Sequence, residues 1–265
     1  MTHGTDETAT DETVTDDVLK VVGVTVRHGG LVALNDVSLA VPAGSIAGLI
    51  GPNGAGKTTF IDTLTGFTRS RTGRIFFAGE SVEDLAPHER SRRGLVRTFQ
   101  SLELFDDLTV RENLLVAAST PTLRSTITDL FFRKDQHSAS ADQLMEDLDL
   151  TRWADRLPTE LSNGQRHLVA LARAVVARPK LLLLDEPAAG LDTTETAELS
   201  AILARLPERG TSVLLVDHDM ALVLGICHTV HVLDFGNVIA SGTPTEIRSD
   251  PQVIAAYLGQ QGDPT

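Results

Sequence analysis

The chain has 265 residues, of which 42% are hydrophobic, so it can bury a substantial core and a wholly disordered protein is excluded. Its 36 acidic residues against 23 Lys and Arg give a formal net charge of -13. This balance argues against non-specific nucleic-acid binding as the main activity, because neutralising phosphates needs a basic surplus. The single cysteine, Cys227, excludes an internal disulfide, and no apolar run approaches the ~18 residues of a membrane helix. These features predict a soluble cytoplasmic protein.

Residues 1–17 are predicted to be a disordered acidic tail. They are rich in threonine and acidic residues and almost free of apolar side chains. The tail also lacks the basic and apolar regions of a signal peptide. Residues 18–259 carry the apolar pattern of one folded domain, and 260–265 form a second short tail.

In chain order, the first part of this domain reads as strands followed by a helix. Strands are predicted at 18–26, 35–41 and 45–50, then a helix over 60–67 and a strand within 73–79. The stretch 101–160 differs, because a capping box at Thr109–Glu112 predicts a helix start and 141–150 has helical spacing. We therefore expect a helical insertion at about 101–160.

After residue 161 the pattern returns to alternating helices and strands. Helices are predicted at 167–177 and 196–206, buried strands at 181–185 and 212–217, and a hairpin at 229–242 with Gly236-Asn237 at its turn. Short apolar strands that alternate with helices are typical of a mostly parallel sheet covered on both faces. The fold class is therefore α/β.

A phosphate-binding loop is predicted at residues 51–58, which fit G-x-x-x-x-G-K-[ST] between a strand and a helix. Glycines let successive backbone N–H groups turn toward a phosphate, and the following helix directs its N-terminus at the anion. Lys57 is expected to reach the terminal phosphates, and the Thr58 hydroxyl to bind Mg²⁺. A chance glycine-rich turn would give the full pattern in roughly one such chain per hundred. The predicted nucleotide-binding residues here are Gly51, Pro52, Asn53, Gly54, Ala55, Gly56, Lys57, Thr58 and Thr59.

Two carboxylates, Asp185 and Glu186, directly follow the buried strand at 181–185. Ligands of open α/β sheets bind at the carboxyl ends of the strands, where the phosphate loop also lies. Asp185 is therefore predicted to hold Mg²⁺, through water, and Glu186 to polarise an attacking water. An acidic turn without function is the alternative for this pair alone.

Three further elements complete an ordered set of motifs: LSNGQ at 161–165, PAAGLD at 187–192, and His218 after the next strand. Together with the phosphate loop they resemble the ATP-binding subunit of ABC transporters, over residues 18 to about 259. The resemblance implies an ABC ATPase domain with a P-loop NTPase core, N-terminal antiparallel strands and the helical insertion. It also implies hydrolysis of ATP with Mg²⁺ by two subunits that sandwich each nucleotide head to tail.

The resemblance assigns roles to residues that spacing alone leaves open. Glu186 corresponds to the catalytic base, His218 to the switch histidine, and Asp192 to the aspartate that crosses the dimer interface. Gln100 corresponds to the glutamine that contacts Mg²⁺ and couples to the membrane subunit. His28 stands where an aromatic residue stacks on adenine, with less ring area than Tyr or Phe. The signature motif, expected to contact the γ-phosphate held by the opposite subunit, comprises Ser162, Asn163, Gly164 and Gln165.

Ser162 also has a plain structural interpretation, as the N-cap of its helix. A helix N-terminus with a glycine-exposed backbone is a second anion site beside the phosphate loop. Two such sites in one chain are consistent with two chains that sandwich each nucleotide. Asn163 occupies a position where the family most often has glycine.

The segments HGGLVALNDVSL, LTGFTRSRTG, GLVRTFQSLELFDDLTVRENLLVA, DEPAAGLD and VIAAYLG resemble the ATPases of branched-chain amino-acid uptake systems. That implies an importer with a second ATPase subunit, identical or related, two transmembrane permeases and an external solute-binding protein. The chain would then lie on the inner face of the plasma membrane, with no nucleic acid as partner. One alternative is a soluble ABC-type ATPase acting on DNA or ribosomes, which would need long coiled coils or tandem domains. The other alternative, a P-loop kinase, would not explain the signature motif.

Overall fold

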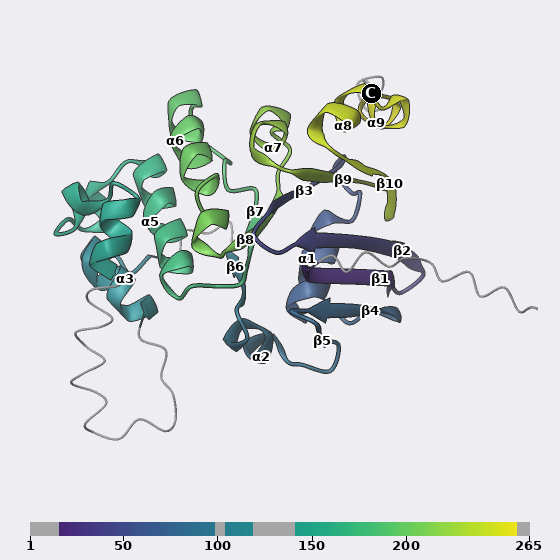
Figure 1. Cartoon of the computed structure of the whole chain (residues 1–265), viewed down its shortest axis with the longest axis horizontal. Helices are drawn as coiled ribbons and strands as arrows, with labels where there is room; N and C mark the ends of the chain where they lie inside the picture. Colours follow the sequence, from purple (N-terminus) through teal and green to yellow (C-terminus); the bar gives the residue numbers. More distant parts are fainter. Residues whose placement is uncertain (1–15, 99–103, 119–140, 259–265) are drawn as a thin grey trace, which may run out of the picture.

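The computed structural model describes residues 16–98, 104–118 and 141–258, and its centre is a six-stranded sheet (Figure 1). The strand order is β10-β9-β3-β8-β7-β6. Every neighbouring pair is parallel except β9 and β10, so the predicted mostly parallel sheet is confirmed. Its strands are β3 (Ile46–Ile50), β6 (Leu95–Thr98), β7 (Leu181–Asp185), β8 (Ser212–Val216), β9 (Thr229–Asp234) and β10 (Asn237–Gly242).

A second, antiparallel sheet is built from the N-terminal part of the chain, as predicted, in the order β2-β1-β4-β5. His231 of β9 joins it to the parallel sheet: its Nε2 donates to the Ala40 carbonyl of β2 over 3.1 Å, and its Nδ1 lies 2.8 Å from Ser241 Oγ. This contact links the edge of the antiparallel sheet to β9. The four strands are β1 (Asp17–His28), β2 (Leu31–Pro42), β4 (Thr72–Phe77) and β5 (Glu80–Ser81).

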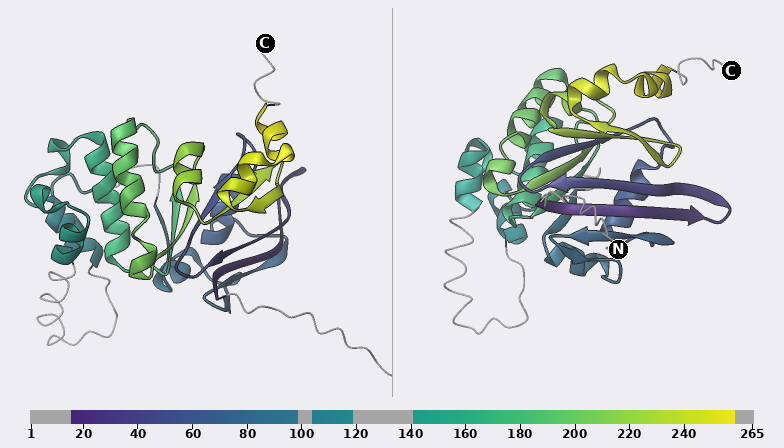
Figure 2. Two further views of the ribbon diagram at one scale, coloured as in Figure 1. Left: turned by 45° about the horizontal axis from the view of Figure 1, so that its top comes forward. Right: turned by 45° about the vertical axis from the view of Figure 1, so that its right-hand side comes forward.

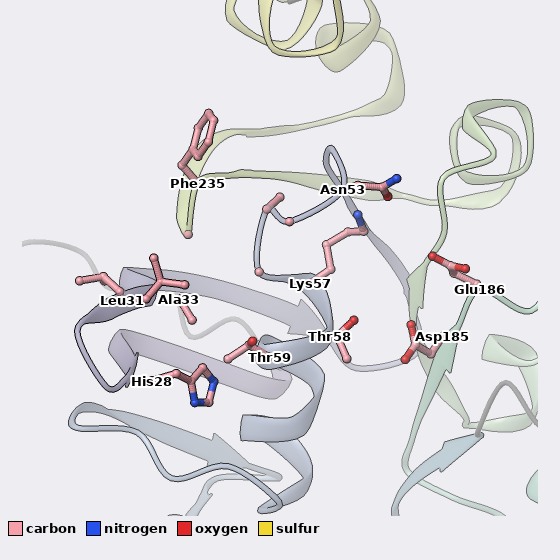
Figure 3. Close-up of a pocket in the computed structure, with 15 residues that line it drawn as sticks. His28, Leu31, Ala33, Asn53, Lys57, Thr58, Thr59, Asp185, Glu186 and Phe235 are labelled. Carbon is pink, nitrogen blue, oxygen red and sulfur yellow. The ribbon is translucent and has the colours of Figure 1, made fainter. Parts of the chain in front are cut away.

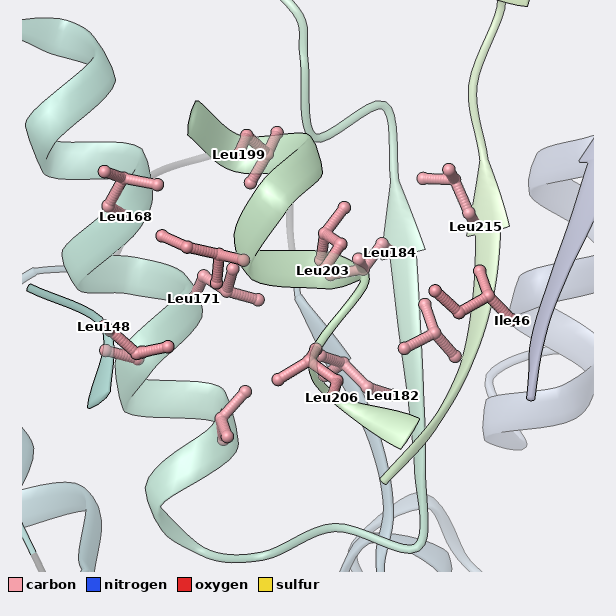
Figure 4. Close-up of a cluster of buried hydrophobic side chains, with 14 of the residues drawn as sticks. Ile46, Leu148, Leu168, Leu171, Leu182, Leu184, Leu199, Leu203, Leu206 and Leu215 are labelled. Atoms are coloured by element: carbon pink, nitrogen blue, oxygen red, sulfur yellow. The ribbon is translucent and has the colours of Figure 1, made fainter. Parts of the chain in front are cut away.

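Both faces of the parallel sheet are buried, because successive side chains of a strand point to opposite faces. On β7, Leu182 and Leu184 face one hydrophobic cluster and Leu181 and Leu183 face the other. Figure 4 shows the first cluster, in which leucines of α5 and α6 pack against β7. The opposite face packs against α1 and the antiparallel sheet. The main helices are α1 (Lys57–Thr65), α2 (Pro87–Arg92), α5 (Asn163–Val176), α6 (Thr193–Leu203), α7 (Met220–Ile226), α8 (Pro244–Ser249) and α9 (Pro251–Leu258).

The helical insertion lies at the end of the molecule opposite the antiparallel sheet (Figure 2). Its described part contains α3 (Val110–Ala118), a helical stretch at 141–147, and the short helices Thr151–Trp153 and Pro158–Glu160. The predicted capping box is confirmed, since the Glu112 carboxylate accepts from the Thr109 N–H over 2.8 Å and Thr109 Oγ1 accepts from the Glu112 N–H over 3.2 Å. Leu114 and Trp153 share one hydrophobic cluster with α5, so the insertion packs on the core.

The turn of the β9–β10 hairpin differs from the prediction by one residue. Phe235 and Gly236 occupy it, with φ of 42° and 77°, and Asn237 already pairs with Asp234 in the ladder. A two-residue type I′ turn requires positive φ at both central positions, and the ladder register places Phe235 at the first of them. The prediction of Gly236-Asn237 at this turn is therefore wrong.

Candidate nucleotide-binding site

The phosphate loop connects the end of β3 to the start of α1, and two of its glycines are required by space as well as conformation. Gly51 and Gly56 have φ of 155° and 107°. A Cβ atom at Gly51 would lie 2.0 Å from the Leu233 carbonyl oxygen, and one at Gly56 would lie 2.6 Å from that of Ala33. No other residue fits these two positions without moving the backbone.

The N-terminus of α1 faces this loop, and its N-cap Gly56 has no side chain to accept the first N–H groups. Lys57 Nζ donates to the carbonyl oxygens of Gly51, over 2.7 Å, and Pro52, over 3.0 Å. A helix N-terminus with exposed N–H groups and an adjacent ammonium favours a bound anion. The local chemistry of this loop therefore suits a bound phosphate group.

A cavity of about 420 Å³ opens beside the loop (Figure 3). Figure 3 shows His28 on the side of the antiparallel sheet and Asp185 and Glu186 at the end of β7, with the phosphate loop between them. The sequence-predicted residues that line the cavity are His28, Asn53, Gly54, Ala55, Gly56, Lys57, Thr58, Thr59, Asp185 and Glu186.

Sequence reasoning missed several residues of this cavity wall. Leu31, Val32 and Ala33 of β2 line it, as do Phe235 and Gly236 of the β9–β10 turn. The β9–β10 turn is anchored to the site by its backbone, because the Gly236 N–H donates to the Ala55 carbonyl over 2.9 Å. The aromatic residue Phe235 beside Gly236 in the predicted hairpin was the available sequence signal.

Lys57 sits among carboxylates and is half-buried. Burial lowers the pKa of the Lys57 ammonium below its ordinary value, and Glu186, Asp185 and Asp217 oppose that shift by Coulombic attraction. The cavity therefore has a desolvated cation and carboxylates at the same edge of the sheet, the arrangement that phosphoryl chemistry needs.

Asp185 is buried and is held by an arginine that the sequence did not reveal. Arg97 of the neighbouring strand β6 donates from Nη2 to Asp185 Oδ2 over 2.8 Å and from Nη1 to Asp62 Oδ1 over 2.6 Å. Asp62 belongs to α1, so one guanidinium connects the helix after the phosphate loop to the carboxylate at the end of β7. Arginine at such a site orients a carboxylate as well as neutralising it.

Glu186 and His218 come from the ends of two adjacent strands and approach each other. Glu186 adopts a φ of 50°, and its N–H donates to the Val216 carbonyl over 2.7 Å. His218 Nδ1 lies 3.8 Å from Glu186 Oε1 and 3.6 Å from Asp217 Oδ1. Positive φ in a residue with a side chain is uncommon and concentrates at functional sites. The structure thus brings the proposed base and the proposed switch histidine together.

The donor set fits a Mg²⁺ ion that is bound together with a nucleotide. The Thr58 hydroxyl and the Asp185 carboxylate are hard oxygen donors that line one cavity. Among residues 16–98, 104–118 and 141–258, no cluster of three or more His, Cys, Asp or Glu side chains could hold a metal alone. Mg²⁺ commonly takes one or two protein ligands and completes its shell with phosphates and water. Gln100 lies outside the described residues.

The four residues proposed as the signature motif lie at the N-terminus of α5, and they do not line this cavity. Ser162 is the N-cap, as predicted: its Oγ accepts from the Gln165 N–H over 3.2 Å, and Gln165 Oε1 accepts from the Ser162 N–H over 3.0 Å. Asn163 Nδ2 donates to the Gly190 carbonyl over 3.4 Å, so this departure from glycine ties the signature to the loop before α6.

Asp192 is the N-cap of α6, and its Oδ1 accepts from the N–H groups of Thr194 and Glu195, each over 2.8 Å. It ends the loop that starts at Glu186. His167 of α5 holds the same loop, since its Nδ1 lies 3.1 Å from the Pro187 carbonyl oxygen. The loop is therefore fixed at both ends and attached to the signature helix.

A phosphate loop at the end of β3 and carboxylates at the end of β7, on a mostly parallel covered sheet, define a P-loop nucleoside-triphosphate hydrolase. The model of the ABC transporter family matches residues 34–189, and that of the branched-chain amino acid ATP-binding cassette transporter matches residues 237–263. The chain belongs to the ABC transporter family as an ATP-binding subunit, and it is an ATPase.

Relatives and solved structures agree with this assignment over most of the chain. The chain is 43% identical over 250 residues to the high-affinity branched-chain amino acid transport ATP-binding protein BraF of Pseudomonas aeruginosa, covering 92% of this chain and 98% of BraF. MJ1267, an ATP-binding cassette of an ABC transporter in its ADP conformation, matches with a TM-score of 0.81 and 32% identity, covering 92% and 99%. The ATP-binding cassette MJ0796, a dimer bound to ADP and Pi, matches with a TM-score of 0.68 and 25% identity, covering 85% and 98%. These relatives and structures do not favour the alternative of an ATPase acting on DNA or ribosomes.

Proposed function

We propose that this chain powers an importer of branched-chain or related amino acids. The observation that carries the proposal is one cavity lined by Lys57, Thr58, Asp185 and Glu186, in a chain 43% identical to a branched-chain amino acid transport ATP-binding protein. The C-terminal match over residues 237–263 supports the same subgroup. The solute itself would be selected by the partner proteins.

In the proposed reaction, the phosphate loop and Lys57 bind the β- and γ-phosphates of ATP. Thr58 and Asp185 would hold Mg²⁺, together with Gln100 as the resemblance implies. Bound there, the ion would neutralise charge that develops on the transferring phosphoryl group. Glu186 takes a proton from the attacking water, and His218, 3.8 Å from it, orients the Glu186 carboxylate and stabilises the γ-phosphate. His28 stacks on the adenine ring of ATP at the far side of the cavity.

A second ATPase subunit, identical or related, would complete each site. Ser162, Asn163, Gly164 and Gln165 would contact the nucleotide held by the partner subunit, and Asp192 would cross the interface. Two observations support this: the signature donors lie away from the cavity of their own chain, and MJ0796 forms a dimer bound to ADP and Pi.

Two transmembrane permeases and, indirectly, an external solute-binding protein would complete the importer, with this chain on the inner face of the plasma membrane and no nucleic acid as partner. In the described ranges no helix has the length and apolar character that a membrane span needs. An exposed aromatic residue supports the proposal that the helical insertion docks the permeases, since Phe105 is 44% exposed. The Phe105 backbone is held on both sides by Asn113, which accepts from its N–H over 2.9 Å and donates to its carbonyl over 3.0 Å.

Two variants test the catalytic assignment. Glu186→Gln should keep ATP binding, lower the hydrolysis rate by roughly 10²-fold or more, and accumulate an ATP-bound dimer. Lys57→Ala should weaken ATP binding itself, by roughly tenfold to a hundredfold. The matched control is Glu208→Gln, which neutralises an exposed carboxylate remote from the cavity. Hydrolysis at the parental rate in Glu186→Gln would show that the proposed base is wrong.

A pull-down tests the transport assignment. The tagged chain, expressed together with transmembrane permeases of a branched-chain amino acid importer from the same organism, should co-purify with them from solubilised membranes. Phe105→Ser should reduce that recovery while leaving ATP hydrolysis by the isolated chain unchanged. A chain that stayed wholly soluble in the presence of those permeases would contradict the importer proposal.

A further inference from the structure

The carboxylate of Glu195 connects the N-termini of two helices that carry proposed dimer-interface residues. Its Oε1 accepts hydrogen bonds from the Gly164 N–H, over 3.1 Å, and from Ser162 Oγ, over 3.3 Å. Its Oε2 accepts from the Asp192 N–H over 3.3 Å. Glu195 stands in the first turn of α6, and α6 packs beside α5 (Figure 1). One side chain therefore occupies donors of the signature and of the loop that ends at Asp192.

The donors that Glu195 takes from α5 form an anion site. The Gly164 N–H lies in the first turn of that helix, where backbone N–H groups have no partner within the helix and the helix dipole favours negative charge. The Ser162 hydroxyl is the second donor to the same carboxylate oxygen. In the single chain, one carboxylate oxygen, Oε1 of Glu195, already occupies both donors.

Gly164 has no side chain in the space that the Glu195 carboxylate occupies. A Cβ atom on Gly164 would lie 2.3 Å from the Glu195 Cδ and 2.4 Å from its Oε1. The absence of a side chain is therefore what lets the carboxylate reach the helix end. The same open space would admit a phosphate oxygen in place of Oε1.

We propose that the Glu195 carboxylate is an internal competitor for this site: it occupies the donors of Ser162 and Gly164 in the single subunit and must be displaced by the terminal phosphate of the partner's nucleotide. The inference rests on the proposed function, in which these donors contact that phosphate. A carboxylate and a phosphate cannot share the two donors, because both are anions and each needs the same N–H. Glu195 thereby lowers the affinity with which two ATP-bound subunits pair.

The surrounding contacts allow this displacement without unfolding α6. Asp192 Oδ1 accepts from the N–H groups of Thr194 and Glu195, so the helix keeps its N-cap when the Glu195 side chain moves. The bond from the Asp192 N–H to Oε2 can persist while Oε1 leaves the signature. For the same reason, variants at Glu195 should retain the fold.

The test measures pairing in a background that does not hydrolyse ATP. The proteins are Glu186→Gln alone and combined with Glu195→Ala, Glu195→Gln or Glu198→Ala, the last being a control at an exposed carboxylate on the same helix. Sedimentation over a range of protein concentrations with saturating ATP gives the dimer dissociation constant. Fluorescent-ATP titration at low protein concentration gives the affinity of the monomer's own cavity, and urea unfolding checks the fold.

Glu195→Ala should lower the dimer dissociation constant by roughly tenfold, as expected for the loss of a competing charge-assisted hydrogen bond. Glu195→Gln should give a smaller decrease, because its amide oxygen still accepts hydrogen bonds but carries no charge. Glu198→Ala should match the background, and the monomer affinity for ATP should be equal in all four proteins. A dimer dissociation constant that is unchanged or higher in both folded Glu195 variants overturns the inference. If Glu186→Gln binds ATP but pairs neither alone nor combined with Glu195→Ala, the proposed pairing of two identical subunits fails and the inference falls with it.

Discussion

Arg97 donates a hydrogen bond from Nη2 to Oδ2 of Asp185 over 2.8 Å, so the carboxylate proposed to hold the metal ion is oriented by the adjacent strand. The same guanidinium contacts Asp62 of α1 over 2.6 Å. The side chains of Arg97 and Asp185 are 11% and 9% exposed, so water screens this pair weakly. The helix after the phosphate loop and the carboxylate proposed to hold the metal ion thus share one cation.

Replacing Arg97 by glutamine should therefore reduce both stability and metal-dependent binding. Removing one partner of a buried ion pair leaves an uncompensated charge, which costs about 3 kcal/mol of unfolding free energy at the low end of the usual range. Loss of a residue that orients a metal ligand typically weakens metal affinity about tenfold or more. Urea unfolding measures the first effect, and ATP binding titrated with Mg²⁺ measures the second.

Arg93→Gln is the matched control for Arg97. Arg93 forms an ion pair with Glu80 at 2.6 Å, but these side chains are 43% and 70% exposed. Exposed pairs contribute under about 1 kcal/mol, so Arg93→Gln should be nearly neutral. Equal destabilisation in the two variants would contradict the argument from burial.

The fold and the phosphate loop could be predicted from sequence because their signals are local. The apolar runs that become β3, β7 and β8, and the spacing of residues 51–58, depend only on near neighbours in the chain. The roles of Arg97 and Glu195 could not be predicted in this way. Arg97 and Asp185 are 88 positions apart, and Glu195 and Gly164 are 31 apart, so each pair exists only once the strands and helices are assembled.

The hairpin turn shows a different limit of sequence reasoning. Gly followed by Asn is a favourable turn pair, yet the β9–β10 register places the turn one residue earlier, at Phe235-Gly236. A positive φ is unfavourable for phenylalanine, so the turn preferences of the individual residues predicted the wrong register. The pairing of two strands overrode the preference of a single residue.

The backbone at Gly51 leaves no room for a methyl group, which makes Gly51→Ala a test of the phosphate loop. A Cβ there would lie 2.0 Å from the Leu233 carbonyl oxygen, at a φ of 155°. The loop must then shift, and we expect ATP affinity to fall by roughly a hundredfold, with about 2–3 kcal/mol of destabilisation from the strain. Calorimetric ATP titration and urea unfolding measure the two effects.

Gly30→Ala provides the comparison for Gly51→Ala. Gly30 lies in the β1–β2 turn near the cavity wall, and an added Cβ there would meet nothing within 4 Å. This variant should bind ATP normally and keep its stability. If Gly51→Ala behaved like Gly30→Ala, the close approach of the loop to β9 would not be what holds it in shape.

His231 should make stability depend on pH through its buried neutral ring. Burial lowers the pKa of His231 below its ordinary value of 6.5, so the unfolded chain takes up a proton at higher pH than the folded chain does. The unfolding free energy should therefore fall as pH drops below about 6.5, by at most about 1.4 kcal/mol per pH unit for one proton.

Urea unfolding at pH 7.5, 6.5 and 5.5 measures this dependence, with His231→Gln as the non-titrating comparison. Glutamine can still donate toward the Ala40 carbonyl, so the cost at pH 7.5 should be limited to about 1–2 kcal/mol. His167, whose pKa is also lowered by burial, contributes equally to both proteins. Equal pH slopes in the two proteins would mean that His231 does not carry the dependence.

Phe235 holds a conformation that its side chain disfavours, so a better turn residue should stabilise the protein. Its φ is 42° and its side chain is 82% exposed, so the ring gains little from burial. Asparagine is preferred at the first position of a type I′ turn, and Phe235→Asn should raise the unfolding free energy by about 1 kcal/mol. Phe67→Asn is the control, because Phe67 is also exposed, at 61%, but is not among the described residues with positive φ. A gain in both variants would point to lost surface hydrophobicity, whereas a gain in Phe235→Asn alone identifies backbone strain beside the phosphate loop.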